Sequence, residues 1–229
     1  MLKITDVSVR AKLVFCMASM LILSACTTTE SHKTLTPQTV ETYRTAYSGE
    51  KAVIVVGHFQ NRSNYLQGVF SSGTDYLGNQ AKTILKTHLQ QTNRFNVVDR
   101  ENMPRLAEEA KLSGVTQNLQ GARIAITGDV TEYGRKNTGD RGLFGIVGAS
   151  KTQTAYAKVA LNLINVTTSE IIYTTQGAGE YALSNREVLG TGSTAGYDST
   201  LNGKVLNLAI TEAVNNMVRD LQNGVWSIK

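Results

Sequence analysis

The residue with the clearest chemical role in this sequence is Cys26, which follows Leu23, Ser24 and Ala25. The two residues before the cysteine are small, so a peptidase can approach the backbone closely at this point. A cysteine that becomes the first residue after such a cut offers its thiol to a diacylglyceryl group. We therefore expect Cys26 to carry acyl chains, and each methylene buried in a membrane contributes about 0.8 kcal/mol to the attachment.

Residues 1–25 have the pattern of a secretory signal peptide, because three basic residues precede an apolar run over residues 13–23. This run is shorter than the roughly 20 residues that a membrane-spanning helix needs. The Leu-Ser-Ala-Cys sequence resembles the bacterial lipobox, and the alternative is an ordinary signal peptide that happens to contain a cysteine. Thr27 replaces the aspartate associated with inner-membrane retention. The pattern thus predicts a lipid anchor in the outer membrane, with the domain facing the periplasm.

The composition argues against several other kinds of chemistry. Cleavage removes three basic residues and one acidic residue, which lowers the formal charge from +5 to +3, too little to indicate nucleic-acid binding. Cys16 lies in the apolar run and Cys26 is acylated, so no thiol remains for a disulfide, a metal or a nucleophile. The three histidines lack partners at the spacing of a metal site or a catalytic triad. We expect no cofactor and no metal.

Two further stretches could be mistaken for catalytic or phosphate-binding motifs. Asp99, Arg100 and Glu101 form a charged cluster, but a solvated helix start with Asp99 as its N-cap explains them more simply. Residues 139–148 contain several glycines without the strand, GxxxxGK[ST] loop and helix of a phosphate site. The sequence therefore favours a protein that is not an enzyme.

The chain after the signal peptide divides into a tether and one domain. Residues 26–50 are polar and predict a flexible lipidated tether. Residues 51–229 suit one globular domain, for which hydrophobic periodicity predicts an α/β (α+β) fold with a mixed sheet flanked by helices. The expected strands are 52–56, 95–98, 124–130, 156–166 and 171–173, and the expected helices are 77–89, 103–110 with a stop at Gly114, and 205–221, the first capped by Thr74 or Asp75.

Three blocks of the sequence resemble the CsgG family, which includes the outer-membrane lipoprotein that exports curli subunits. The blocks are Arg94 to Asn102 (RFNVVDREN), Ala125 to Tyr133 (AITGDVTEY) and Val159 to Glu170 (VALNLINVTTSE). They occur in the family's order, and the similarity extends from the strand at Ala52 to the terminal Gly224-Val225-Trp226.

The resemblance implies a homo-oligomeric ring in which each subunit contributes two β-hairpins to a membrane barrel. By position, these hairpins correspond to residues 134–158 and 174–202. The apolar side chains that could face lipid in the first are Leu143, Phe144, Ile146 and Val147, which could equally form a loop tip packed on a neighbour. The second segment shows poor apolar alternation, which weakens the expectation of a pore.

The family's curli exporter also has a constriction loop, and the matching stretch here is residues 61–72. Asn64, Tyr65 and Phe70 are the candidates for lining a narrowing, while an ordinary surface loop with both aromatic rings folded onto the domain is the alternative.

Two functions follow from the resemblance. The first is an oligomeric secretion channel or platform of the curli assembly/transport type, with secreted fibre subunits and periplasmic accessory proteins as partners. The second is a non-pore periplasmic lipoprotein scaffold of an envelope machine, as in a flagellar outer ring or a peptidoglycan-synthase activator.

Overall fold

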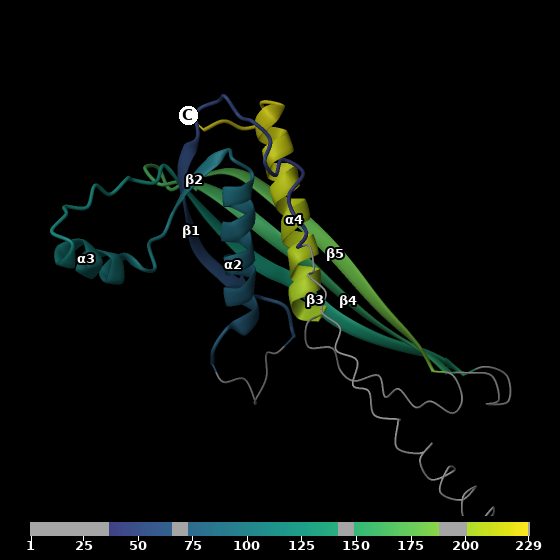
Figure 1. The fold of residues 1–229 in the computed structure, drawn as a ribbon. Coiled ribbons are helices and arrows are strands. Elements are labelled where there is room, and N and C mark those ends of the chain that lie inside the picture. The colour runs from purple at the N-terminus through teal and green to yellow at the C-terminus, as the bar shows by residue number, and fades with distance from the viewer. Residues whose placement is uncertain (1–36, 66–72, 142–148, 188–200, 229) are drawn as a thin grey trace, which may run out of the picture. The chain divides into compact units, whose positions relative to one another are not determined.

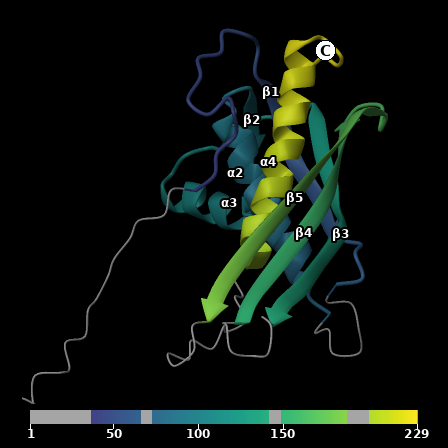
Figure 2. The ribbon, with the colours of Figure 1, turned by 90° about the vertical axis from the view of Figure 1, so that its right-hand side faces the viewer.

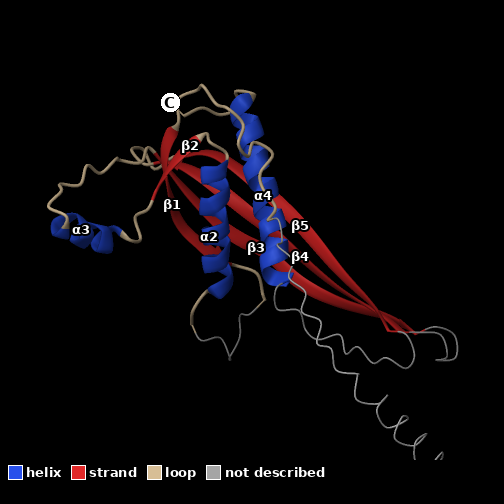
Figure 3. Ribbon diagram, viewed as in Figure 1, coloured by secondary structure: helices blue, strands red, loops and turns tan. Residues whose placement is uncertain are grey.

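Five strands form one mixed sheet, and two long helices cover one of its faces (Figures 1 and 3). The computed structural model describes residues 37–65, 73–141, 149–187 and 201–228. The predicted α+β class with a mixed sheet is confirmed. The elements are β1 (Ala52–Asn61), α2 (Tyr76–Gln91), β2 (Phe95–Val98), α3 (Met103–Leu112), β3 (Ile124–Arg141), β4 (Ala149–Asn165), β5 (Ile171–Glu187) and α4 (Leu201–Gln222).

The strands lie in the order β2-β1-β3-β4-β5. β1 is parallel to both β2 and β3, whereas β3, β4 and β5 are antiparallel. The turn between β4 and β5 is the one that the sequence predicts at residues 167–169. There the Asn165 side chain accepts a hydrogen bond from the Thr167 backbone at 2.8 Å, and Ser169 has a φ of 61°.

Helix α2 forms because Leu77, Ala81, Leu85 and Leu89 recur every four residues and all lie buried against the sheet. Asp75 is its N-cap, and the carboxylate accepts a hydrogen bond from the Gly78 backbone at 2.7 Å. One of the two predicted caps is thereby confirmed.

Helix α4 packs closest to the sheet where β5 carries glycine. A Cβ at Gly177 would overlap the backbone of Ala209 and Ala213, and one at Gly179 would overlap Ala209 and Leu208. Two glycines in β5 therefore allow the helix backbone to lie directly on the strand. Along α4, the apolar residues predicted as a broad stripe form the centre of the core.

Four strands, β1, β3, β4 and β5, are longer than the sequence pattern suggests, and bulges interrupt the alternation in β1 and β3. The register shifts between Val56 and Phe59 in β1, and between Val130 and Glu132 in β3. Each bulge adds one residue to its strand and so shifts by one the positions whose side chains face the core. Phe59 and Tyr133 are therefore buried although they break the period of two. Beyond its bulge, β3 continues to Arg141.

Residues 38–50, which we call the strap, lie against the helices and belong to the same compact unit as the sheet. Val40 is buried in the core, and the Glu41 backbone donates to the Asn215 side chain at 3.0 Å. Farther along, Arg94 donates to the Thr45 hydroxyl at 2.7 Å. The part of the expected tether from residue 38 onward is therefore packed on the domain. Within the described ranges, no helix is both long enough and apolar enough to cross a membrane.

The contact between α4 and β5 yields a stability prediction. Gly177→Ala should destabilise the domain by about 1–3 kcal/mol, because the added Cβ meets helix backbone that cannot move without shifting α4. Gly121→Ala is the matched control, since a Cβ there meets nothing within 4 Å. Urea unfolding followed by circular dichroism measures both, and an equal midpoint for the two variants would contradict this account of the packing.

Candidate functional site

The three antiparallel strands continue past the end of the helix layer (Figure 1). We call residues 134–141 of β3, 149–157 of β4 and 180–187 of β5 the strand extension. Its base still packs on the core, at Ala155, Tyr181 and Leu183. Each strand contributes eight or nine residues, and the register is continuous up to the pairs Arg141 with Ala149 and Ala149 with Glu187. The extension is thus an uninterrupted continuation of the domain's own sheet.

The two predicted hairpin segments occupy different environments. The described residues of 134–158 are all strand. In the segment 174–202, residues 174–187 are strand, whereas the buried Leu201 and the partly buried Asn202 form the start of α4. Insertion of either segment into lipid remains a prediction. Leu143, Phe144, Ile146, Val147, Phe70 and Cys26 lie outside the described residues.

Four side chains meet where the extension leaves the domain, and we call this cluster the junction: Tyr65, Tyr133, Arg135 and Asn202. The rings of Tyr65 and Tyr133 lie 4.4 Å apart between centroids at 45°. Asn202, in the first turn of α4, accepts hydrogen bonds from the Tyr133 hydroxyl and from Arg135 Nε, the latter at 3.1 Å. The junction therefore ties the end of β1, the extension and α4 together.

The loop after β1 is organised by its first residue. The Asn61 side chain donates to the Tyr65 carbonyl at 2.7 Å and accepts from the Ser63 backbone at 3.0 Å, while the Asn61 backbone donates to Asp75 at 2.7 Å. Of the predicted constriction residues, Asn64 is exposed and Tyr65 packs half-buried on the domain. A role for either at a narrowing remains a prediction.

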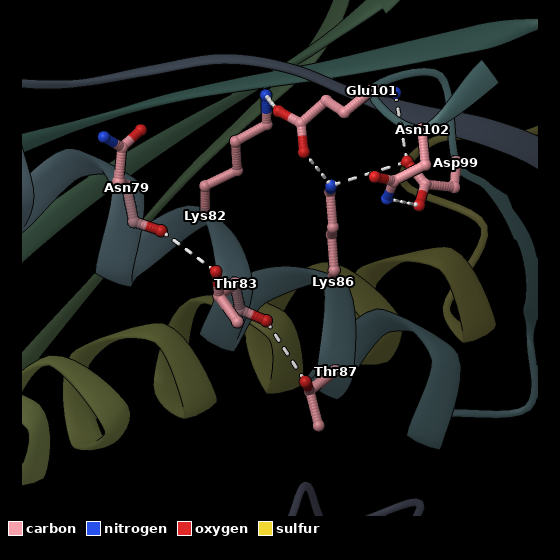
Figure 4. A network of polar contacts seen from close by, with 8 residues as sticks. All are labelled: Asn79, Lys82, Thr83, Lys86, Thr87, Asp99, Glu101 and Asn102. Atoms are coloured by element: carbon pink, nitrogen blue, oxygen red, sulfur yellow. Dashed lines mark hydrogen bonds and ion pairs between the residues drawn. The ribbon is translucent and has the colours of Figure 1, made fainter. Parts of the chain in front are cut away.

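A polar cluster connects α2 to the segment that precedes α3 (Figure 4). Glu101 bridges Lys82 and Lys86, the second at 2.5 Å. Asp99 accepts hydrogen bonds from the Glu101 backbone at 3.0 Å and from the Asn102 side chain at 2.5 Å. The prediction that Asp99 caps α3 is wrong: the N-cap is Asn102, which makes no side-chain capping bond, because Asp99 instead closes the turn before it.

This cluster lowers the pKa of both carboxyl groups. For Asp99 the main cause is the hydrogen bond from Asn102. For Glu101 it is the hydrogen bond from Lys82, followed by that from Lys86. The sequence analysis missed the ion pairs of Glu101 with Lys82 and Lys86. Their signal was a pair of lysines one helical turn apart on α2, with two acidic residues after the next strand.

The described residues hold no group of three or more histidine, cysteine or acidic side chains that could bind a metal. His88 is buried and contacts the side chains of Asn207 and Thr211 on α4 at 2.7 and 3.1 Å, so it joins the two helices. A cleft of about 260 Å³ lies at the carboxyl end of β1. Two of its charged residues are engaged, Asp75 as a helix cap and Lys82 with Glu101.

The described chain is thus one α+β domain with a strand extension at one end and no grouped metal ligands. The sequence model of the family described as "Curli production assembly/transport component CsgG" matches residues 38–229, and the chain belongs to this family. The family resemblance predicted from the sequence is confirmed. A protein of Neisseria meningitidis serogroup B (strain MC58), which bears the name of a lipoprotein, is 58% identical over 209 residues, covering 91% of this chain and 93% of that protein.

Two solved structures resemble the chain more distantly. The PelC dodecamer from Paraburkholderia phytofirmans is 16% identical, with a TM-score of 0.35 over 72% of this chain and 87% of that one. Lipoprotein GNA1162 from Neisseria meningitidis is 15% identical, with a TM-score of 0.32 over 76% and 99%. Both TM-scores are low, so the fold class is assigned from the sheet of this structure and not from these two similarities.

The pKa shifts of the polar cluster lead to a pH prediction. A carboxyl group whose pKa is lower in the folded protein stabilises the fold at a pH above its pKa in the unfolded chain, which is about 4.3 for Glu. This stabilisation is lost as the pH falls through the pKa of the group in the folded protein. The difference in urea midpoint between wild type and Glu101→Gln should therefore be small but measurable above about pH 5 and vanish in more acidic buffer. Glu108→Gln is the control, because Glu108 is exposed on α3. A difference that grows on acidification would contradict the assignment.

Proposed function

We propose that this chain is an outer-membrane lipoprotein, held by acyl groups on Cys26 with its domain in the periplasm. It assembles into a homo-oligomeric ring that serves the secretion or assembly of extracellular fibre subunits, together with periplasmic accessory proteins. Membership of a family described by curli assembly and transport supports this proposal, as does the lipoprotein name of the Neisseria meningitidis relative.

The observation that carries the proposal is the path of the strap along α4. Gln38 contacts Asn207 near the start of the helix, and Glu41 contacts Asn215 two turns farther on. Gln38, the first residue of the compact unit, is therefore tied to the first half of α4. Asn202, in the first turn of this helix, belongs to the junction at the base of the strand extension.

The length of chain between Cys26 and the domain limits how far the domain can lie from the membrane. Cys26 precedes Gln38 by twelve residues, a length of chain that reaches at most about 40 Å. An acylated Cys26 thus holds Gln38 within this distance of the membrane surface. The part of the extension beyond the core contacts of Ala155 and Leu183 is the part that we assign to the secretion channel.

One observation favours the second candidate, a non-pore scaffold of an envelope machine. The first half of the segment 174–202 lies under α4, with Gly177 buried and Tyr181 beneath the Lys204 ammonium at 5.1 Å. Residues engaged in this way cannot enter lipid while α4 stays in place. A scaffold would use the same anchor and ring without opening a pore.

The anchor is tested with Cys26→Ala. This variant should keep its fold, because residue 26 precedes the compact unit that begins at Gln38. It should appear as a soluble periplasmic species or stall during processing, since the acyl attachment is lost. Fractionation of cells by density gradient gives the readout, with Thr27→Ala as the control that keeps the thiol. Retention of Cys26→Ala in outer membranes would mean that the extension or a partner holds the protein.

The channel is tested with the purified acylated protein in planar bilayers. Rings that carry a continuous pore should give discrete single-channel conductance, and the same preparation should show the rings by electron microscopy. Protein diluted to the monomer serves as the control. Rings without defined conductance would refute the channel and leave the scaffold.

A further inference from the structure

Residues 99–121, which we call the arm, project from the sheet between β2 and β3 and carry helix α3. No residue of α3 is buried. Leu106, Ala107 and Ala110 share one side of the helix, and Val115 follows on that side after the turn at Gly114. Leu106 is 46% exposed and Val115 60%, so the arm shows an apolar stripe that nothing in the described chain covers.

The arm has a defined internal structure. Arg100 donates to the carbonyl of Gln120, which joins the two ends of the arm. Helix α3 ends in a Schellman turn, in which Gly114 has a φ of 67° and the Val115 backbone donates to the Ala110 carbonyl at 3.0 Å. A stripe that is already ordered loses little conformational entropy when it docks.

The sheet has the complementary surface on the face opposite α2 and α4, which we call the open face. Val98, Val55, Ala125 and Ile164 pair with one another in succession across four strands and so share this face. All four are only partly buried. Closer to the strand extension, the residues on the same face are polar, as in the ion pair of Lys158 with Glu132 at 2.8 Å. A solvated open face is usually polar throughout, so the apolar row is unusual.

The chain topology explains why this face lacks a helix. α2 connects β1 to β2, and the arm then runs back across β1 to β3. Right-handed connections in opposite directions place their helices on opposite faces of a parallel sheet, so α3 would cover the open face. Instead α3 stands off the edge of β2 on the side of α2 (Figures 1 and 2). There Glu101 bridges Lys82 and Lys86 of α2 and keeps the arm on that side.

We propose that the arm of one subunit docks its apolar stripe on the open face of a second copy of this chain. Each chain has an apolar helix stripe that no sheet covers and an apolar row on a sheet face that no helix covers. Because both surfaces belong to the same chain, we infer that a second copy is the partner. The two surfaces consist of different residues, so the contact is head to tail, and repetition of such a contact builds a ring when its rotation closes. This inference rests on the oligomer of the proposed function and identifies the interface.

Cysteine cross-linking tests this interface in the full mature protein. Cys16 is removed with the signal peptide and Cys26 is acylated, so an introduced cysteine is the only free thiol. Leu106→Cys and Ile164→Cys, made in separate chains and mixed, should form a disulfide heterodimer under mild oxidation. Leu106→Cys alone should not, since a head-to-tail contact keeps identical residues apart. Leu112→Cys is the control, because Leu112 is 76% exposed on the opposite side of α3.

A second pair of variants tests the interface without a substitution at Ile164, so a folding defect at that residue does not affect the result. Leu106→Glu should abolish the oligomer in light scattering and leave the circular dichroism spectrum unchanged, whereas Leu112→Glu should change neither. An oligomeric wild type without the heterodimer would overturn this interface alone, and another surface would then build the ring. A monomeric wild type would overturn both the interface and the proposed ring. Cross-linking within a single chain that carries both Leu106→Cys and Ile164→Cys, without cross-linking between chains, would show that the arm closes on its own sheet.

Discussion

The contact that the rest of the structure depends on is the close approach of α4 to β5 at Gly177 and Gly179. Because these residues lack a Cβ, the helix backbone lies directly on the strand and buries one whole side of α4. This position determines two other features. It places Asn202 within reach of Tyr133, and it presents Asn207 and Asn215 to the strap. The junction and the position of the strap are therefore consequences of one helix packing on two glycines.

This packing also limits which residues of β5 can serve a membrane segment. Tyr173, Tyr181 and Leu183 all pack against the core beside α4. Removing them to lipid would leave the buried face of α4 without a partner, which costs several kcal/mol of apolar burial. Any membrane segment on β5 that is compatible with this core therefore begins beyond Leu183, and not at residue 174. On β3 and β4 the corresponding contacts reach as far as Arg135, which binds Asn202, and the buried Gln153.

The sequence was sufficient for the central strands and for α2 and α4, because their buried residues follow regular periods of two or close to four. It was insufficient where a bulge shifts the period, so that Phe59 and Tyr133 did not register as core positions. The length of β5 was also missed, since Gly177 and Gly179 are weak strand formers that are selected here for contact with a helix. The junction joins residues from three separate parts of the chain, and Asn202 carries no local signal of its contacts with Tyr133 and Arg135. Asp99 was assigned as a cap from its position alone, whereas a competing turn uses its carboxylate.

The strength of the contacts at the base of the arm bears on how a head-to-tail ring could form. Glu101 is half exposed, with 52% of its side chain accessible, so its ion pairs with Lys82 and Lys86 are screened by water and each contributes at most about 1 kcal/mol. These ion pairs are side-chain contacts that join the base of the arm to α2. They are weak enough for the arm to adjust its angle when a neighbouring sheet offers burial for Leu106, a side chain that contributes about 1.5–3 kcal/mol when fully buried. A rigid arm would demand an exact fit between subunits, whereas a weakly held arm with an ordered helix tolerates the small rotations that closing a ring requires.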